Sequence, residues 1–191
     1  SICVLGIFMA GWGSNNKYSL LGGMRSAAQI VSYEVPLIIS MVTAVMFAGT
    51  LSMQKIVEAQ RGMWFVFQPN MALAFLIFVI SGTAEINRTP FDIPVGESEV
   101  VGGPFVEYSG IRWSMFFLAE YAALFILALL GSAVFLGGWA WPLGEQFGLG
   151  WQLLLTTVKA GLFIFTVFWV RATLPRLRID QLMGFAWKVL L

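Results

Sequence analysis

Residues 113–136 read WSMFFLAEYAALFILALLGSAVFL, and Glu120 is the only charged side chain in this run. A helix needs about 20 predominantly apolar residues to cross the hydrocarbon core of a bilayer, so this segment predicts a transmembrane helix. Three other apolar runs also predict transmembrane helices once their flanking residues are included: Pro36 to Leu51, Met71 to Thr83 and Trp151 to Val170. Polar or Gly/Pro-rich stretches separate the four runs.

The composition of the whole chain supports this interpretation. Hydrophobic residues make up 59% of the 191 residues and charged residues only 11%, and the mean hydropathy is +0.83. About a quarter of an ordinary soluble chain is charged, so a soluble globular class is excluded. We therefore expect an all-α fold, a polytopic transmembrane helix bundle that forms a single membrane domain over residues 1–191.

The two ends of the sequence are also apolar, but each is only about half a span long. They read SICVLGIFMAGWG at residues 1–13 and LMGFAWKVLL at residues 182–191. We expect the chain to run from the end of one helix, through four full spans, into the start of another. A signal peptide is the alternative for the first stretch, but it lacks a basic region and a small-residue cleavage site.

Charge and cysteine content exclude several functions. A formal net charge of +1 gives no basic surface for nucleic acid. With Cys3 as the only cysteine and no histidine, the chain alone cannot hold an iron–sulfur cluster, a haem or a zinc ion, and we expect no metal site. Nucleotide-binding glycine motifs are absent from the sequence as well.

Basic residues are distributed unequally between alternate loops. Loops around 14–32, 87–112 and 171–181 hold Lys17, Arg25, Arg88, Arg112, Arg171, Arg176 and Arg178, whereas the opposite loops hold only Lys55 and Arg61. The positive-inside rule places the first set in the inner compartment. Within the first of these loops, residues 20–33 predict a short helix with Arg25 and Gln29 one turn apart.

Four charged residues fall within the predicted spans: Glu34, Glu85, Glu120 and Lys159. Ionisable groups inside a membrane are costly and mark functional sites by default. Glu34 and Glu85 also fit simple interfacial carboxylates, because both lie near helix ends. Lys159 has two interpretations, a side chain that reaches the headgroups or a charge partner of a buried glutamate.

The loop after Glu85 is unusually acidic for a loop on the basic side of the membrane. It holds Asp92, Glu97, Glu99 and Glu107, with Arg88 as a basic residue among them. Prolines and glycines at several positions indicate a shaped backbone. The alternative is a solvated acidic surface.

Several motifs of this sequence, in their order and spacing, resemble the H-subunit family of respiratory complex I, which includes NADH dehydrogenase subunit 1 of mitochondria. The motifs are GWGSNNKYSLLGGMRSAAQIVSYEVP (11–36), AEINRTPFDIPVGESE (84–99), EYSG (107–110), FFLAEY (116–121), WVRATLPRLRIDQLM (169–183) and WK (187–188). The resemblance covers nearly the whole chain and implies that it runs from the end of the family's third helix to the start of its eighth.

The resemblance also implies roles for individual residues. Arg25, Arg88, Asp92, Glu97 and Glu99 fall on the family's quinone-chamber loops, and Glu34, Glu85 and Glu120 fall on its intramembrane acidic channel, with Lys159 as a possible charge partner. The chain departs from the family at Val95, where relatives usually carry an acid, and at Gly103-Pro104, where a small-aromatic pair is more usual.

The function implied is that of a membrane subunit of a proton-translocating NADH:quinone oxidoreductase. Quinone would be the substrate, and FMN, NADH and the iron–sulfur clusters would belong to partner subunits in the membrane and peripheral arms. The expected location is the bacterial inner (plasma) membrane, with an organellar inner membrane as the alternative. Two other functions stay open from the residues: a homologous subunit of a ferredoxin- or F420-linked oxidoreductase or membrane hydrogenase, and a stand-alone proton-coupled transporter.

Overall fold

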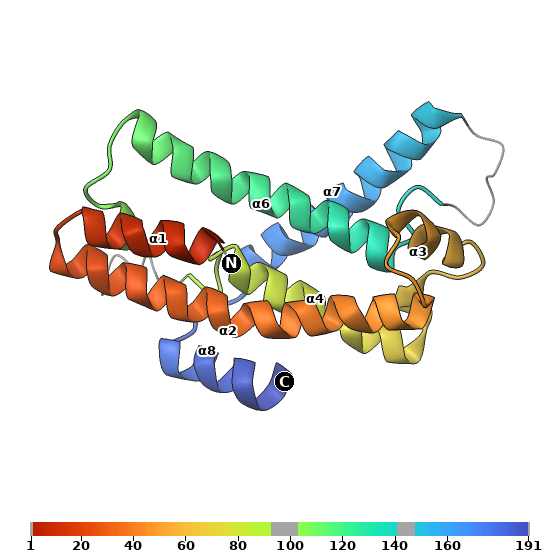
Figure 1. The fold of residues 1–191 in the computed structure, drawn as a ribbon, viewed down its shortest axis with the longest axis horizontal. Helices are drawn as coiled ribbons and strands as arrows, with labels where there is room; N and C mark the ends of the chain where they lie inside the picture. Colours follow the sequence, from red (N-terminus) through yellow and green to blue (C-terminus); the bar gives the residue numbers. More distant parts are fainter. Residues whose placement is uncertain (1, 93–102, 141–147, 191) are drawn as a thin grey trace. The chain divides into compact units, whose positions relative to one another are not determined.

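The structure is a computed structural model, and it describes residues 2–92, 103–140 and 148–190. Every regular element in these ranges is helical (Figure 1), which confirms the all-α expectation. The elements, in chain order, are α1 (Ile2–Gly13), α2 (Lys17–Ala48), α3 (Met53–Ala59), η1 (Phe65–Phe67), α4 (Pro69–Glu85), η2 (Gly103–Phe105), α6 (Ile111–Phe135), α7 (Leu149–Thr173), α8 (Ile179–Phe185) and η3 (Ala186–Leu190).

Among the described residues, three helices are long and apolar enough to cross a membrane: α2, α6 and α7. The fourth expected span, at residues 71–83, is the 17-residue helix α4, which is apolar but shorter. At 1.5 Å per residue it extends about 25 Å. Proline at its first position fits the missing N–H there, and Asn87, with φ of 54°, turns the chain away after its last residue.

The prediction of a separate short helix at residues 20–33 is wrong. Helix α2 continues from Lys17 to Ala48 without a break, with Pro36 inside it. A proline removes only one hydrogen bond of the helical ladder, and membrane helices tolerate this loss. The start of α2 is set by Asn16, whose side-chain oxygen accepts a hydrogen bond of 3.1 Å from the backbone N–H of Tyr18.

The described chain separates into two compact units. The first comprises Ser1–Pro36, Ser81–Ala122 and Val170–Leu191, and the second comprises Leu37–Ile80 and Ala123–Trp169. The three loops predicted to share the inner compartment therefore all belong to the first unit. The loop that holds Lys55 and Arg61 belongs to the second.

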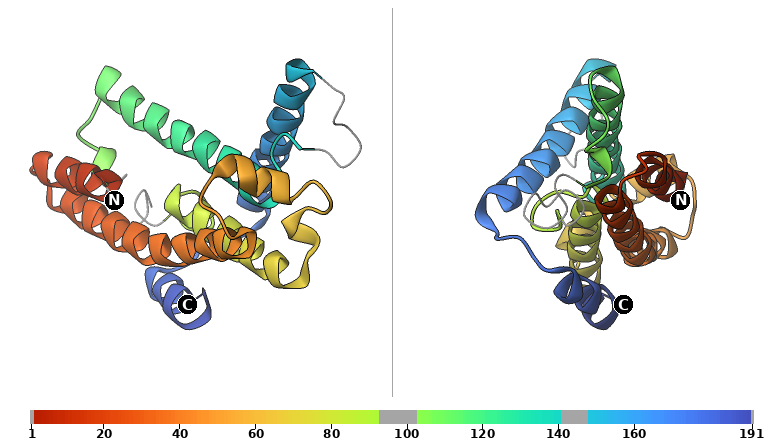
Figure 2. Two further views of the ribbon diagram at one scale, coloured as in Figure 1. Left: turned by 45° about the vertical axis from the view of Figure 1, so that its right-hand side comes forward. Right: turned by 90° about the vertical axis from the view of Figure 1, so that its left-hand side faces the viewer.

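Helices α1 and α2 pack closely within the first unit, where Figures 1 and 2 show them side by side. The contact depends on glycine, because a Cβ atom on Gly11 would lie 2.9 Å from the carbonyl oxygen of Ser19 and 3.2 Å from the Cα of Gly23. Small residues permit such backbone approach between membrane helices.

The second unit has an aromatic core. Phe78 and Phe135 are fully buried, and the ring centroid of Phe78 lies 6.0 Å from that of Phe163.

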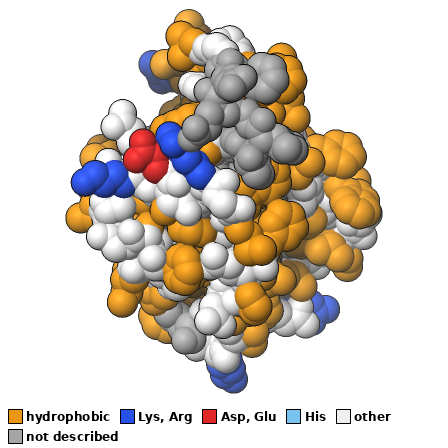
Figure 3. All heavy atoms as spheres, turned by 90° about the vertical axis from the view of Figure 1, so that its right-hand side faces the viewer, with side chains coloured by type: hydrophobic (Ala, Val, Ile, Leu, Met, Phe, Trp, Pro, Cys, Tyr) orange, Lys and Arg blue, Asp and Glu red, His pale blue; other side chains and the backbone are white. Residues whose placement is uncertain are grey.

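The outside of the molecule also carries many apolar side chains, and Figure 3 shows a face on which hydrophobic side chains predominate. Such surfaces suit lipid or neighbouring helices rather than water.

Candidate functional site

The candidate site is built around the chain that follows α4. Asn87 adopts the left-handed conformation, which asparagine tolerates better than most residues, and its N–H bonds to the carbonyl of Ala84 at 3.2 Å. In the same segment, the N–H of Phe91 donates a hydrogen bond of 2.8 Å to the carbonyl of Arg88. Residues 87–91 therefore form a compact turn with Arg88 near its start.

Gln29 of α2 holds both sides of this turn. Its side-chain amide donates a hydrogen bond of 2.8 Å to the carbonyl of Ala84 and another of 2.8 Å to the carbonyl of Phe91. Gln29 is only 1% exposed. A buried side chain that satisfies two backbone carbonyls 7 residues apart fixes the distance between them.

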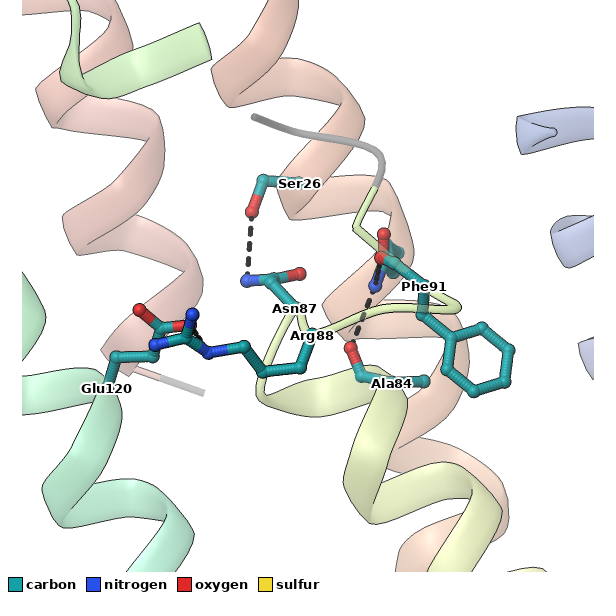
Figure 4. Close-up of polar contacts among 7 residues, drawn as sticks. Ser26, Ala84, Asn87, Arg88, Phe91 and Glu120 are labelled. Carbon is teal, nitrogen blue, oxygen red and sulfur yellow. Dashed lines mark hydrogen bonds and ion pairs between the residues drawn. The ribbon is translucent and has the colours of Figure 1, made fainter. Parts of the chain in front are cut away.

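Two further contacts attach the turn to its surroundings. The side-chain amide of Asn87 donates to the hydroxyl of Ser26 at 3.4 Å, and the N–H of Leu177 donates to the carbonyl of Pro90 at 3.0 Å (Figure 4 shows the first). Close by, the ring of Tyr33 packs on Phe91 and its hydroxyl donates to the carbonyl of Leu182. The turn is thus anchored to α2 and to the segment before α8.

The anchored turn directs Arg88 to Glu120. The Nε atom of Arg88 lies 2.8 Å from Oε1 of Glu120, and the two side chains are 17% and 25% exposed (Figure 4). Its guanidinium carbon also lies 5.0 Å from the ring centroid of Tyr121 and 5.8 Å from that of Phe117. A largely buried ion pair bounded by aromatic rings is the central feature of the site.

Other charged side chains lie close to this pair. Asp92 and Arg171 are near enough to Glu120 for their charges to act on it, and Glu34 acts in the same way on Glu85. Glu34, Glu85 and Asp92 are half-buried. Arg25, also half-buried, lies one helical turn before Gln29 on α2.

Six of the residues that we predicted for the site belong to the first unit: Arg25, Glu34, Glu85, Arg88, Asp92 and Glu120. Glu97, Glu99 and the departure at Val95 lie outside the described residues. Gly103, at the other predicted departure, has φ of 62° and packs against Gly22 of α2.

Lys159 is different, because it lies in the second unit. The residue is 7% exposed, and its ammonium donates to three backbone carbonyls, those of Leu136, Gly138 and Ala140. Its side chain therefore does not extend to the surface. Among the described residues its hydrogen-bond partners are carbonyls rather than a carboxylate, and the buried glutamate Glu120 pairs with Arg88.

The sequence interpretation also missed residues that hold the site. Gln29, Ser26 and Asn87 carry no charge, so a search for charged groups within the spans does not find them. A glutamine in a predominantly apolar helix is nevertheless a signal of a buried hydrogen-bond partner. Within the described ranges, buried atoms without a hydrogen-bond partner include Oε1 of Gln29, Oδ1 of Asn87 and Nη2 of Arg88. These three atoms are available to water or to a polar ligand.

The site gathers ionisable side chains and polar atoms that lack a hydrogen-bond partner. No group of three or more potential metal-ligating side chains occurs among the described residues. Carboxylates, a guanidinium and unsatisfied amide groups in a partly buried setting provide acceptors and donors that respond to a change of nearby charge.

Comparison with known proteins gives a consistent result. The model of the family described as NADH dehydrogenase matches residues 1–191. A relative from Brevibacillus brevis, named as the H subunit of NADH-quinone oxidoreductase, is 52% identical over 100% of this chain and 56% of its own length. Relatives with the same name from Geobacillus kaustophilus and Chlorobaculum tepidum are 52% and 50% identical, and the chain covers 56% and 57% of their lengths. The chain thus spans about half the length of the curated relatives it matches.

Proposed function

The chain belongs to the NADH dehydrogenase family, and we propose that it forms the quinone-chamber and proton-channel part of the membrane subunit of a proton-translocating NADH:quinone oxidoreductase. The names of its relatives support this proposal. In this assembly NADH, FMN and the iron–sulfur clusters belong to partner subunits, which agrees with a sequence that has one cysteine and no histidine.

The substrate is a quinone, which takes up two electrons and two protons to become a quinol. Partner subunits supply the electrons, and the protons come from the inner compartment. Adding electrons before protons places negative charge in a site of low dielectric, where the charge acts strongly on nearby ionisable groups. Carboxylates that interact with one another then change protonation as a group.

In this proposal the residues divide into two sets. Arg25, Arg88, Asp92, Glu97 and Glu99 line the quinone chamber, and Glu34, Glu85 and Glu120 carry protons away from it. Lys159 has no part in the relay, because its hydrogen bonds are directed to backbone carbonyls of the second unit.

The observation that carries the proposal is the ion pair between Arg88 and Glu120, at 2.8 Å. It joins a residue of the chamber loop to a carboxylate of the relay. Negative charge on the quinone attracts Arg88 and weakens its hold on Glu120. A carboxylate that loses its cationic partner in a partly buried site binds a proton more readily, so charge in the chamber becomes proton uptake in the membrane.

We also propose which molecules surround this subunit and in which membrane it lies. Its neighbours are the other membrane subunits and the peripheral-arm subunits of complex I, together with the lipid bilayer. The bacterial relatives support the plasma membrane as its location. The three helices of the described residues that are long and apolar enough to span a bilayer agree with this location.

The test compares two ion pairs of the same chain. Arg88→Gln removes the cation of the buried pair, and Arg61→Gln removes the cation of the exposed pair with Glu58, which is 3.9 Å long. In the assembled complex, we expect Arg88→Gln to lower NADH:quinone turnover about tenfold or more while electron transfer to an artificial acceptor upstream of quinone is unchanged. Arg61→Gln leaves both activities near the native level.

Equal loss of both activities in a fully assembled Arg88→Gln complex would place the residue outside the quinone site. Native quinone turnover in that variant would also contradict the proposal.

A further inference from the structure

The end of helix α6 forms an unusual backbone turn in the second unit. Gly137 and Gly138 both have positive φ, 72° and 46°, and the N–H of Gly138 returns to the carbonyl of Ser132 at 2.8 Å. Left-handed residues in succession reverse the chain after the helix, and glycine adopts this conformation without strain. The carbonyls of Leu136, Gly138 and Ala140 consequently converge on one point.

The ammonium of Lys159 occupies that point. Its Nζ atom lies 2.7 Å from the carbonyl oxygen of Leu136, 2.8 Å from that of Gly138 and 3.1 Å from that of Ala140. An ammonium has three N–H donors, and here three acceptors match them. The indole ring of Trp64, 4.6 Å away, closes another side with its electron-rich face.

The walls of this site are held in place by other contacts. A Cβ atom on Gly137 would lie 3.1 Å from the ring of Trp64, and a Cβ atom on Gly138 would lie 3.2 Å from a methyl group of Val57. Gln60 donates from its side-chain amide to the carbonyls of Ala133 and Val134, at 3.2 and 3.0 Å. Gln60 and Lys159 together thus supply donors to the carbonyls of Ala133, Val134 and Leu136 at the end of α6.

We propose that the carbonyls of Leu136, Gly138 and Ala140, with the ring of Trp64, form a binding site for one primary ammonium group, which Lys159 fills from α7. We name it the ammonium site. It joins the end of α6 to α7 through three hydrogen bonds. The site belongs to the second unit, whereas the proposed relay belongs to the first.

The surroundings of the site favour the charged form of the amine. A neutral amine has two N–H groups and a lone pair, so one of the three carbonyls would lose its donor and face the lone pair. The end of α6 also carries the negative end of the helix dipole, which favours a cation. A lysine buried in a membrane helix is normally costly, and three carbonyls with an aromatic face offset this cost.

The experiment uses the assembled complex and removes the lysine side chain with Lys159→Ala. We expect the Tm of the complex to fall by roughly 5–10 °C, because three charge-assisted hydrogen bonds are lost. The exposed Lys55 of the same unit is the control, and Lys55→Ala leaves Tm unchanged. Each variant is then heated with one of three probes: n-butylammonium, n-butanol or butyltrimethylammonium.

The three probes separate the possible causes of stabilisation. n-Butylammonium has the charge, the N–H donors and the chain length, and we expect it to restore most of the lost Tm of Lys159→Ala. Butyltrimethylammonium keeps the charge and can face Trp64 but has no N–H donor, and n-butanol has no charge, so both restore little. If Lys159→Ala does not accumulate, the same comparison is made on its accumulation in cells grown with each probe.

Equal rescue by all three probes would show that only the apolar volume matters, and equal rescue by the two cations would show that the carbonyls do not select an ammonium. No rescue by n-butylammonium, or a native Tm in Lys159→Ala, would also overturn the proposal. None of these results depends on quinone turnover, so they leave the proposed function to its own test.

Discussion

The Nε atom of Arg88, in the turn after α4, lies 2.8 Å from Oε1 of Glu120 on α6. The same chain has a second ion pair, Arg61 with Glu58, at 3.9 Å and with both side chains more than half exposed. Exposed pairs contribute about 0–1 kcal/mol, whereas breaking a buried pair leaves an uncompensated charge that is costly. The two pairs therefore form an internal comparison in which the charges are alike and the burial differs.

A double-mutant cycle measures this difference. We expect Arg88→Gln and Glu120→Gln to have a coupling free energy of about 1–3 kcal/mol in the unfolding of the purified complex. Arg61→Gln and Glu58→Gln give less than about 0.5 kcal/mol. Coupling free energies of the same size for both pairs would show that burial does not strengthen the Arg88 pair.

Gln29 provides a second prediction, because its amide donates to both sides of the turn, at the carbonyls of Ala84 and Phe91. Gln29→Leu keeps the approximate volume but removes this donor from both carbonyls. The carbonyl of Ala84 keeps the N–H of Asn87, and the loss of the donor to the buried carbonyl of Phe91 costs about 1–3 kcal/mol. We expect hydrogen exchange at the amides of Phe91 and Leu177 to accelerate about tenfold or more.

The control for this measurement is Gln54→Leu on α3, where the side chain is exposed. Its exchange at Phe91 and Leu177 stays native. Unchanged exchange in Gln29→Leu would mean that the turn is held by the contacts of Asn87 and Leu177 without Gln29.

Much of this architecture was predictable, since apolar runs and the scarcity of charge identify membrane helices directly. The three loops that are rich in basic residues also belong to one compact unit. Continuity of α2 through Pro36 was not predictable, because a proline can either end a helix or be tolerated within it, and packing decides which.

The candidate site was predictable in its charges and not in its pairing. Glu120 and Arg88 each attract attention as charged groups near or within a span, but they are 32 positions apart, and no local pattern shows that they meet. Lys159 shows most clearly what the sequence could not predict. Its partners are backbone carbonyls, which every residue possesses, so their convergence depends on the conformation of Gly137 and Gly138.

A third prediction tests the protonic role proposed for Glu120. Glu120→Gln keeps size and hydrogen bonding but removes the titration. We expect an assembled complex in which coupled turnover and proton pumping fall about tenfold. Glu85→Gln should behave similarly, because the proposed relay includes both residues. Glu58→Gln is the exposed control. A native rate with a native ratio of protons to electrons would leave Glu120 as a structural residue.

The fourth prediction concerns orientation in the membrane. A cysteine at Val106, exposed in the first unit, should react with an impermeant reagent only from the inner face of sealed vesicles, and a cysteine at Lys55 only from the outer face. Cys3 is exposed and is replaced by serine in both variants. Labelling of Val106→Cys from the outer face would reverse the topology.

The fifth prediction separates the two effects of adding a methyl group to a helical glycine. Alanine is the better helix former by up to about 1 kcal/mol, so Gly6→Ala, with open space around its Cβ position, should be neutral or stabilising. At Gly22 the new Cβ would lie 2.8 Å from the Cα of Gly103 and 3.1 Å from Cδ of Pro104. Backbone on that side cannot move without displacing η2, and overpacking of this kind costs about 1–3 kcal/mol.

We therefore expect opposite signs for the same substitution, with Gly22→Ala lowering the free energy of unfolding by about 1–2 kcal/mol and Gly6→Ala leaving it unchanged or slightly raised. Thermal unfolding of the two purified variants beside the native complex measures both. Because the sequence resemblance predicts a departure from the family at Gly103, the result also tests how the fold accommodates glycine at this position. A gain in stability from Gly22→Ala would show that η2 yields to the methyl group and that helix propensity decides the sign at this contact.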